Sequence, residues 1–272
     1  MDSDAQIGPS RDTTSGVLTG LVATVAVIVA LPLLIVCVAF AAVLPGVPWW
    51  VGAPVAVIVS GLVVWWMLRN PIDRIVGRLD ASPVDETRHA RLINLVQGLA
   101  LAEGVPEPDL MIIDDPARNV AVAARGDTAV IIATTGLLES LDLVSLEAVV
   151  AEAMVRIGNG DAEAAATGAN LLGVWGSLPV ASVLDPVVSA RLQSALPEDR
   201  DLIADRDAVN LTRYPPGLYQ ALTAMADQNV TVRRARRADD ALWMISPAQA
   251  NGGRHLGPRS SLTLRLDILS EL

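Results

Sequence analysis

Two long runs of apolar residues near the start of the chain contain no charged side chain. They extend from Val17 to Leu44 and from Val51 to Leu68, with a turn at Pro45–Pro48 between them. A membrane-spanning helix needs about 20 apolar residues, and both runs are close to or beyond that length. The pattern therefore predicts a transmembrane hairpin over residues 16–70, preceded by a disordered polar tail over residues 1–15. A pair of buried core helices is the alternative.

Arginine residues gather just after the second run, while the turn between the runs carries no charge: Arg69, Arg74, Arg78, Arg88 and Arg91. Cytoplasmic flanks of membrane helices carry an excess of basic residues. We therefore expect a multi-pass protein of the cell membrane (an inner or plasma membrane), with the turn outside and residues 71–272 in the cytoplasm as one domain.

The pattern after residue 70 changes to amphipathic segments mixed with short apolar runs, which predicts an α+β domain. Three short runs are expected to be strands of a small sheet, namely Leu110–Ile113, Val120–Ala123 and Ala129–Ala133. The rest is expected to be mainly helical, with helices over Asp85–Gly104, within Gly136–Leu143, from a cap at Ser145 to Gly158, over 198–228 with a break at Tyr214–Gly217, and over Leu262–Leu272. The apolar stretch Leu171–Val188 is expected to form a helix pair that rests on the domain or dips into the membrane surface.

Composition narrows the classes of partner and site. All 20 basic residues are arginine, and 30 acidic residues give a net charge of −10, which argues against nucleic-acid binding. The one basic cluster, Arg233–Arg237, is followed at once by acidic residues and is expected to be solvated or salt-bridged. Cys37 is the single cysteine and lies in an apolar run, so no disulfide or thiolate metal site is expected.

The helix around VVAEAMVRIGNGD, Val149–Asp161, has an unusual feature. Its pattern is apolar, yet Glu152 and Arg156 stand one turn apart near its middle. Such a pair needs an explanation, because charged side chains on a buried face require partners.

The segment Arg118–Asp161 and several later segments resemble the HtpX-like zinc metallopeptidases, a family of membrane-anchored gluzincins. The matching pieces occur in the family's order along residues 85–272: Asn119-Val-Ala, Thr134-Thr-Gly-Leu-Leu, Leu146-Glu-Ala-Val, Asn159-Gly-Asp, Asp201-Leu-Ile-Ala-Asp-Arg, Leu242-Trp, Pro247 and Leu262-x-x-Arg-Leu. The resemblance implies a bacterial, membrane-anchored protein with a gluzincin fold, and the predicted hairpin agrees with it.

The family's chemistry uses a His-Glu-x-x-His motif, in which two histidines hold zinc and the glutamate is the general base. Aligned with that motif, Glu152 stands at the first histidine, Ala153 at the glutamate and Arg156 at the second histidine. Asp201 stands where a later helix supplies the third ligand, and Asp205 where the family supports a ligand histidine.

Each of these changes removes a function. Ala153 cannot accept a proton, and a protonated guanidinium at Arg156 has no lone pair for zinc. We therefore expect no catalytic residue, no metal ligand and no cofactor at these positions. Instead, Arg156 is expected to join an ion-pair network with Glu152, Asp201 and Asp205, or else to form an exposed surface pair with Glu152.

The sequence thus predicts a catalytically inactive homologue of an HtpX-like protease that acts as a protein-binding or scaffolding subunit at the membrane. In the family, substrate adds as a strand along an edge that corresponds to Asn119, Val120, Ala121, Val122 and Ala123. Edge-strand addition relies on backbone hydrogen bonds, so it can outlast the metal. Expected partners are the bilayer and other membrane proteins or their cytoplasmic segments. The alternatives are an active metalloendopeptidase with a displaced site that uses His89 or His255, and a purely structural subunit of a membrane complex.

Overall fold

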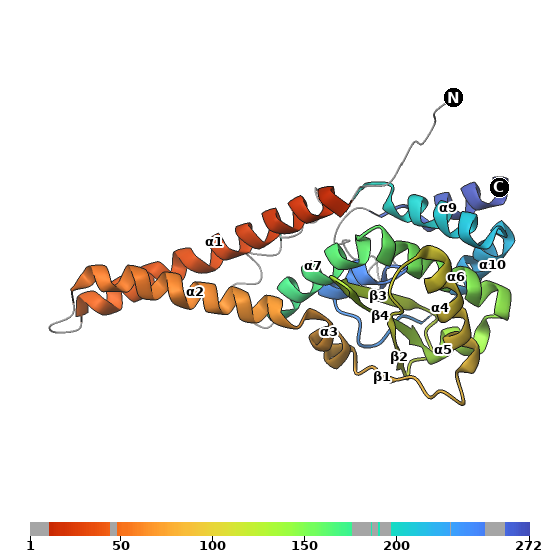
Figure 1. Cartoon of the computed structure of the whole chain (residues 1–272), viewed down its shortest axis with the longest axis horizontal. Helices are drawn as coiled ribbons and strands as arrows, with labels where there is room; N and C mark the ends of the chain where they lie inside the picture. Colours follow the sequence, from red (N-terminus) through yellow and green to blue (C-terminus); the bar gives the residue numbers. More distant parts are fainter. Residues whose placement is uncertain are drawn as a thin grey trace, which may run out of the picture.

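The computed structural model describes residues 11–43, 48–175, 186, 190, 197–228, 230–247 and 259–272. These residues form a long helical hairpin that projects from a globular α+β domain (Figure 1). The hairpin consists of α1 (Arg11–Val43), a short 3-10 turn η1 (Trp49–Val51) and α2 (Gly52–Arg69). The two helices pack together, and they approach closely at Gly52, where an added Cβ would lie 2.6 Å from the carbonyl oxygen of Cys37.

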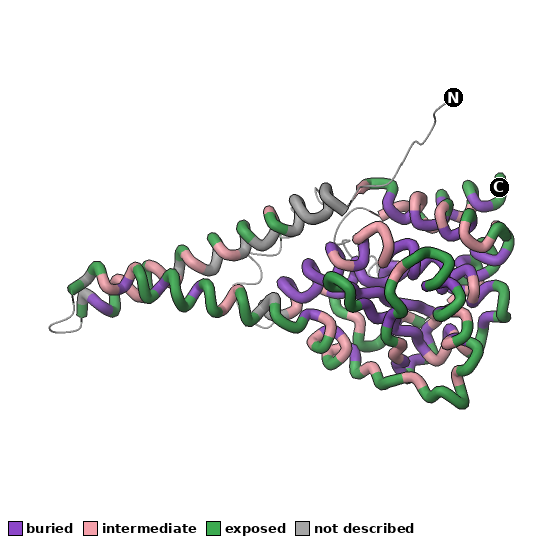
Figure 2. Tube along the Cα trace, in the orientation of Figure 1, coloured by how far each residue is buried: buried purple, intermediate pink, exposed green. Residues whose placement is uncertain are grey.

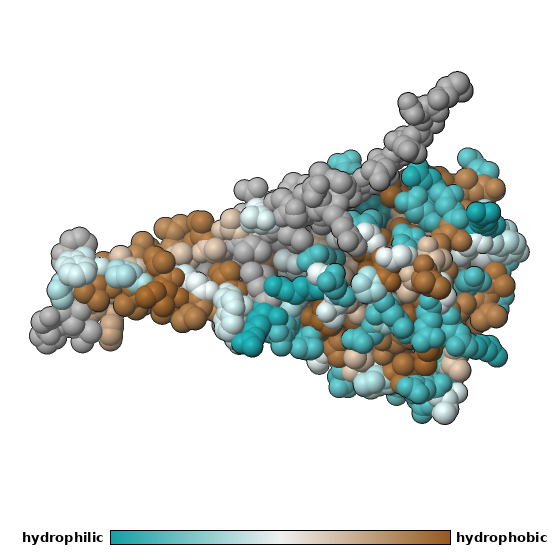
Figure 3. Space-filling view, in the orientation of Figure 1, coloured by the Kyte–Doolittle hydropathy of each residue, from teal (hydrophilic) through white to brown (hydrophobic). Residues whose placement is uncertain are grey.

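Large apolar side chains cover the outside of the hairpin, which is largely hydrophobic in Figure 3. The exposed residues include Val27, Leu31, Ile35, Val36, Phe40, Val57, Ile58, Leu62, Trp65 and Trp66. Among the described residues, no single helix meets the length and apolarity that a bilayer crossing requires, whereas Gly52–Trp66 and Pro71–Leu79, bent by 59°, meet them as a pair.

The domain contains a four-stranded sheet and a set of surrounding helices. The strands are β1 (Ser82–Pro83), β2 (Asp109–Ile113), β3 (Val120–Arg125) and β4 (Thr128–Thr134). The helices are α3 (Pro71–Leu79), α4 (Ala90–Glu103), α5 (Thr135–Ser140), α6 (Leu143–Gly158), α7 (Asp161–Trp175), α9 (Arg200–Thr212), α10 (Pro215–Ala226), η2 (Arg237–Leu242) and α12 (Leu262–Glu271).

The strand order is β1-β2-β4-β3, in which β2 and β4 are parallel and the other neighbours are antiparallel. A tight turn joins β3 to β4, and Gly126 adopts a φ of 57° there, a conformation that glycine adopts without steric cost. The three predicted strands are present within β2, β3 and β4. The two-residue strand β1 was not predicted.

Helices cover both faces of the sheet, so the sheet lies in the buried centre of the domain (Figure 2). Alternate residues of β3 point to opposite faces: Val120 and Val122 belong to one core with α4, α6 and α10, whereas Ala121 and Ala123 belong to a second core with α3, α7 and Trp243. This two-sided burial explains why the strands read as continuous apolar runs in the sequence.

Several predicted boundaries differ from the structure. Helix α1 begins at Arg11, inside the segment that was expected to be a disordered tail, and residues 1–10 lie outside the described residues. Helix α4 begins at Ala90 rather than Asp85, because the Asp85 carboxylate accepts hydrogen bonds from the amides of Thr87 and Arg88 and forms a turn. Of the stretch 171–188, the part up to Trp175 continues α7, and most of the remainder lies outside the described residues.

Candidate functional site

Helix α6 carries the aligned motif positions into the interior of the domain. Its N-cap is Asp142, whose carboxylate accepts a hydrogen bond from the Ser145 amide at 2.8 Å, so the predicted cap at Ser145 is wrong. Glu152, Ala153 and Arg156 are each at most 1% exposed. An exposed surface pair is therefore excluded, and the two charged side chains must be stabilised by interior contacts.

Each nitrogen of the Arg156 guanidinium donates a hydrogen bond. Nε donates to a carboxylate oxygen of Asp161 at 3.1 Å, and the two terminal nitrogens donate to the carbonyl oxygens of Ala241 at 2.8 Å and Leu242 at 3.4 Å. Asp161 begins α7, and the two carbonyl groups end η2. Arg156 therefore fastens three elements together through one side chain.

The expected ion pairs of Arg156 with Glu152 and Asp201 are not among the salt bridges of the described residues. The planar guanidinium is instead directed to Asp161 and to two backbone carbonyls, which use all of its nitrogens. Glu152 and Asp201 still attract the Arg156 charge from nearby, so the network of these side chains stays a prediction, while the direct contacts of Arg156 are with Asp161 and the backbone.

Asp201 on α9 is bound by two other arginines. Its carboxylate accepts a hydrogen bond from Arg259 at 3.0 Å and one from the Ser260 amide at 3.2 Å, and Arg200 Nε lies 3.7 Å away. Arg200 also donates to Asp161 at 3.2 Å and so links the two carboxylates. Burial alone would raise the pKa of Asp201, but Arg259 and Arg200 outweigh it and hold the pKa well below its usual range.

Asp205 has its own buried partner. Arg265 of α12 binds both carboxylate oxygens, at 2.7 and 2.6 Å, and its remaining terminal nitrogen donates to the carbonyl oxygen of Met244 at 3.1 Å. Burial alone would lower the pKa of Arg265, but its contacts with Asp205 raise the pKa above the usual arginine range. Bidentate contacts of this kind are strong and directional, so they fix α12 against α9.

Arg259 shows how crowded the cluster is. Its second terminal nitrogen donates to the carbonyl oxygens of Asp240 at 2.8 Å and Trp243 at 2.5 Å. Burial and the neighbouring guanidinium groups lower its pKa to about 10, although Asp201 acts in the opposite direction. Four buried arginines therefore converge on the backbone of segment 240–244: Arg156, Arg200, Arg259 and Arg265.

The surroundings of Glu152 differ from those of Asp161, Asp201 and Asp205. Both of its carboxylate oxygens are buried without a hydrogen-bond partner in the described structure. Burial raises its pKa to about 7, although Arg156 and Arg265 act in the opposite direction. The nearby guanidinium groups donate to other acceptors, so Glu152 carries a substantial protonated fraction at neutral pH.

The predicted peptide-binding edge is already partly covered. Ala121 pairs with Trp243 in an antiparallel bridge, and the Met244 amide donates to the Val120 carbonyl at 2.9 Å. The side chain of Asn119 then brackets the backbone of Ile245, with Nδ2 donating to its carbonyl at 2.7 Å and Oδ1 accepting from its amide at 3.2 Å. All residues from Asn119 to Ala123 are buried, so an incoming strand would have to displace the segment Trp243–Ile245.

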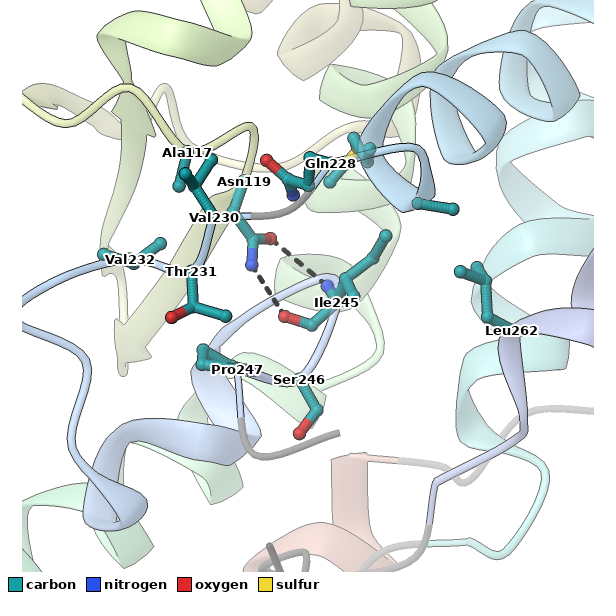
Figure 4. Close-up of a pocket in the computed structure, with 12 residues that line it drawn as sticks. Ala117, Asn119, Gln228, Val230, Thr231, Val232, Ile245, Ser246, Pro247 and Leu262 are labelled. Carbon is teal, nitrogen blue, oxygen red and sulfur yellow. Dashed lines mark hydrogen bonds between the residues drawn. The ribbon is translucent and has the colours of Figure 1, made fainter. Parts of the chain in front are cut away.

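A pocket of about 200 Å³ opens at the end of this covered edge (Figure 4). Its lining is mainly apolar, from Met225, Val230, Val232, Ile245 and Leu262. Two amide side chains in its wall are engaged, since Asn119 binds Ile245 and Gln228 binds the backbone of Arg118. The pocket can therefore accept a small apolar side chain more readily than a charged group.

The zinc ion that the resemblance implies does not fit this donor set. Protein zinc is held by cysteine, histidine and carboxylate groups, whereas Arg156 has no lone pair and the carboxylates of Asp201 and Asp205 are engaged by arginine. His89 is the half-buried N-cap residue of α4, and His255 lies outside the described residues. Over the described ranges, no group of three histidine, cysteine or acidic residues is arranged to hold a metal ion.

Sequence reasoning missed Asp161, Arg200 and Arg259 as members of the cluster. Asp161 was visible as the end of the Asn-Gly-Asp piece, whereas Arg200 and Arg259 belong to none of the matching pieces. What the sequence lacks is any signal for the backbone carbonyls of residues 240–244, which accept most of the arginine hydrogen bonds.

Comparison with known proteins gives a consistent set of relatives. Proteins named Protease HtpX homolog from Dictyoglomus thermophilum and Dictyoglomus turgidum are each 31% identical to the chain, over 57% and 59% of it. The chain covers 60% and 62% of the length of these two relatives. A protein of the same name from Lactobacillus acidophilus is 26% identical over 76% of this chain and 81% of its own length. No family model matches the chain. No solved structure matches it either.

Proposed function

Since this chain is an HtpX-like protein, we propose that it is a membrane-anchored member without protease activity that works through protein contacts. The observation that supports this most directly is the buried guanidinium of Arg156, which stands at the second histidine position and is bound to Asp161, Ala241 and Leu242. If this side chain moved away to admit a metal ion, the Asp161 carboxylate and the two buried carbonyl groups would lose the hydrogen bonds that it donates.

The position of the general base supports the same proposal. Ala153 is fully buried and has no group that could take a proton from water. The neighbouring Glu152 is enclosed, and neither of its oxygens has a hydrogen-bond partner in the described structure. A general base must reach the proton that it abstracts, which a carboxyl sealed in the interior cannot do for a bound peptide.

Membrane anchoring is proposed from the hairpin. Its outer surface is apolar, and at its domain end Arg69 and Arg74 stack on Trp65 and Trp66, at 4.8 and 4.1 Å from the ring centres. Tryptophan and arginine at the end of an apolar helix are typical of a membrane–water interface. Because arginines follow α2, we propose that the protein lies in the cell membrane with its domain in the cytoplasm.

The proposed partners are other membrane proteins or their cytoplasmic segments, and nucleic acid is not among them because the net charge is −10. The apolar pocket beside Asn119 opens at the end of the predicted edge. A second candidate, a purely structural subunit, is favoured by the segment Trp243–Ile245, which covers that edge.

The proposal is tested on the purified full chain. We expect far less than one zinc per chain by mass spectrometry, and no casein cleavage that a chelator suppresses. The matched comparison is a variant with Glu152→His, Ala153→Glu, Arg156→His and Asp201→Glu, which restores the family's side chains. One zinc per wild-type chain together with chelator-sensitive cleavage would contradict the proposal.

A photo-crosslinking residue distinguishes protein binding from a structural role. It is placed at Val230, an exposed residue that lines the pocket, and for comparison at Leu101, an exposed residue of α4. A partner captured from native membranes at Val230 and not at Leu101 supports binding at the pocket. A partner that co-purifies but crosslinks at neither position supports the structural subunit.

A further inference from the structure

The guanidinium of Arg78, a residue of α3, lies against α7 and η2 of the domain. The terminal nitrogen Nη2 forms an ion pair with Asp239 and also contacts the carbonyl oxygen of Ala169 at 3.4 Å. Asp239 is fully buried, and the side chain of Arg78 is only 14% exposed. Gly173 of α7 leaves the necessary space, since a Cβ there would lie 2.7 Å from the central guanidinium carbon.

Asp239 belongs to η2, which leads directly into the arginine-bound segment. After Asp239, the carbonyls of Ala241 and Leu242 accept hydrogen bonds from Arg156, and the Met244 amide donates to β3. The stretch from Asp239 to Met244 is therefore held at one end by Arg78 of α3, in its middle by Arg156 of α6, and at its other end by β3.

Helix α3, which joins the hairpin to the domain, is held on two sides. Helices α2 and α3 meet at a bend of 59°, and Arg74 crosses this bend by donating a hydrogen bond to the Trp66 carbonyl at 2.5 Å and by stacking on the Trp66 ring. On the other side of α3, Ile75 and Leu79 are fully buried in the domain core. Helix α3 is thus fixed both to α2 and to the domain.

We propose that the Arg78–Asp239 ion pair couples the hairpin to the segment Ala241–Met244, so that a change in hairpin tilt changes how firmly this segment is held on β3. The contacts form a contiguous path of packed and hydrogen-bonded groups, and close-packed interiors transmit displacement. The inference rests on the proposed membrane anchoring, because the bilayer is what would set the tilt.

The test is hydrogen exchange of the Met244 amide in the full chain, placed in nanodiscs of short-chain and of long-chain phosphatidylcholine. The variants are Arg78→Gln, which removes the charge, and Gly173→Ala, which keeps both charges but fills the space of the guanidinium. The matched control is Arg234→Gln, because Arg234 pairs with Asp80 at 2.8 Å between two exposed side chains. An exposed pair of this kind contributes little to stability.

In the wild type we expect the Met244 amide to exchange at rates that differ by about threefold or more between the two bilayers. Arg78→Gln should abolish that difference and raise the rate about tenfold, as local opening becomes easier. Gly173→Ala should behave in the same way, and it carries the comparison if Arg78→Gln does not fold. The control should match the wild type.

A wild-type amide that is indifferent to bilayer thickness would overturn the coupling, as would an Arg78→Gln variant that behaves like the control. Rapid exchange of the α2 amides in both bilayers would instead contradict membrane anchoring. In that case the Met244 amide still tests the ion pair. If this amide exchanges faster in Arg78→Gln than in the wild type, the ion pair holds the segment on β3. If its exchange is unchanged, the ion pair does not hold the segment.

Discussion

Glu152 gives the domain a pH dependence that runs opposite to that of an ordinary salt-bridged acid. Its pKa is raised to about 7 from a usual 4.5 because it is buried. The folded state therefore binds a proton that the unfolded state releases between these values. Its contribution to stability is complete below about pH 4.5 and is lost as pH rises to about 7. We expect Glu152→Gln to remove this loss and to stabilise the protein at pH 8 by roughly 2–3 kcal/mol.

The measurement is the free energy of unfolding in urea at pH 5 and pH 8. Glu139→Gln serves as the control, because Glu139 is an exposed acid on α5. The gain from Glu152→Gln should be much larger at pH 8 than at pH 5, and the control should change neither value. Equal effects of the two variants would show that Glu152 ionises normally.

Removing Arg156 should destabilise the domain strongly. Arg156→Ala leaves the buried carboxylate of Asp161 without one of its two arginines, and breaking a buried pair costs roughly 3–5 kcal/mol. In a double-mutant cycle, the cost should shrink clearly once Asp161→Asn is present, and much less with Asp201→Asn. Coupling to Asp201 that equals or exceeds the coupling to Asp161 would contradict the observed pairing.

The sequence showed that charged residues, Glu152 and Arg156, occupy motif positions, but it did not show which groups their side chains contact. The spacing of Glu152 and Arg156 is favourable for a pair on one helix, and it suggested a local contact. In the structure the guanidinium instead binds Asp161 and two backbone carbonyls. Backbone acceptors carry no side-chain signature, so a partner of this kind is invisible until the chain is folded.

Among the elements, α6 depends on its cap because it positions every residue of the aligned motif. Asp142→Ala removes the acceptor for the Ser145 amide and should cost about 1 kcal/mol. Asp142→Asn keeps an acceptor oxygen and is the matched control, with a smaller expected loss. Thermal unfolding of both variants checks this, and equal losses would mean that the carboxylate acts through its charge rather than as a cap.

Elements with a strong pattern were predictable, while their ends were not. The strands β2, β3 and β4 were identified because apolar runs of this length fit strands buried on both faces. The cap of α6 was placed at Ser145 because serine is a good cap, but Asp142 competes for the same role three residues earlier. Strand β1 is only two residues long, too short for a periodic signal.

At the scale of the whole molecule, the hairpin predicts a definite topology. In a background with Cys37→Ser, a cysteine at Pro48 should react with an impermeant thiol reagent in intact cells, and a cysteine at Glu86 should not. Pro48 lies at the far end of the hairpin, and Glu86 lies in the domain. Labelling at Glu86 and not at Pro48 would reverse the orientation, and equal labelling would argue against a membrane barrier between them.

The arrangement of the parts was less accessible from sequence than the parts themselves. The hairpin, the small sheet and the terminal helix could each be expected from local periodicity. The covering of β3 by Trp243 and Met244 could not, because a single bridge between distant segments leaves no repeating pattern. The same holds for the arginines that fasten this segment.

The space at Gly173 has a consequence for how the sequence can change over generations. A side chain there would force the guanidinium of Arg78 to shift from its place beside Asp239, and a shorter residue at 78 would leave the buried Asp239 without its arginine. Gly173, Arg78 and Asp239 lie in separate parts of the chain, but the guanidinium of Arg78 occupies the space beside Gly173 and pairs with the carboxylate of Asp239. Descendants of this gene should therefore change these positions together more often than separately.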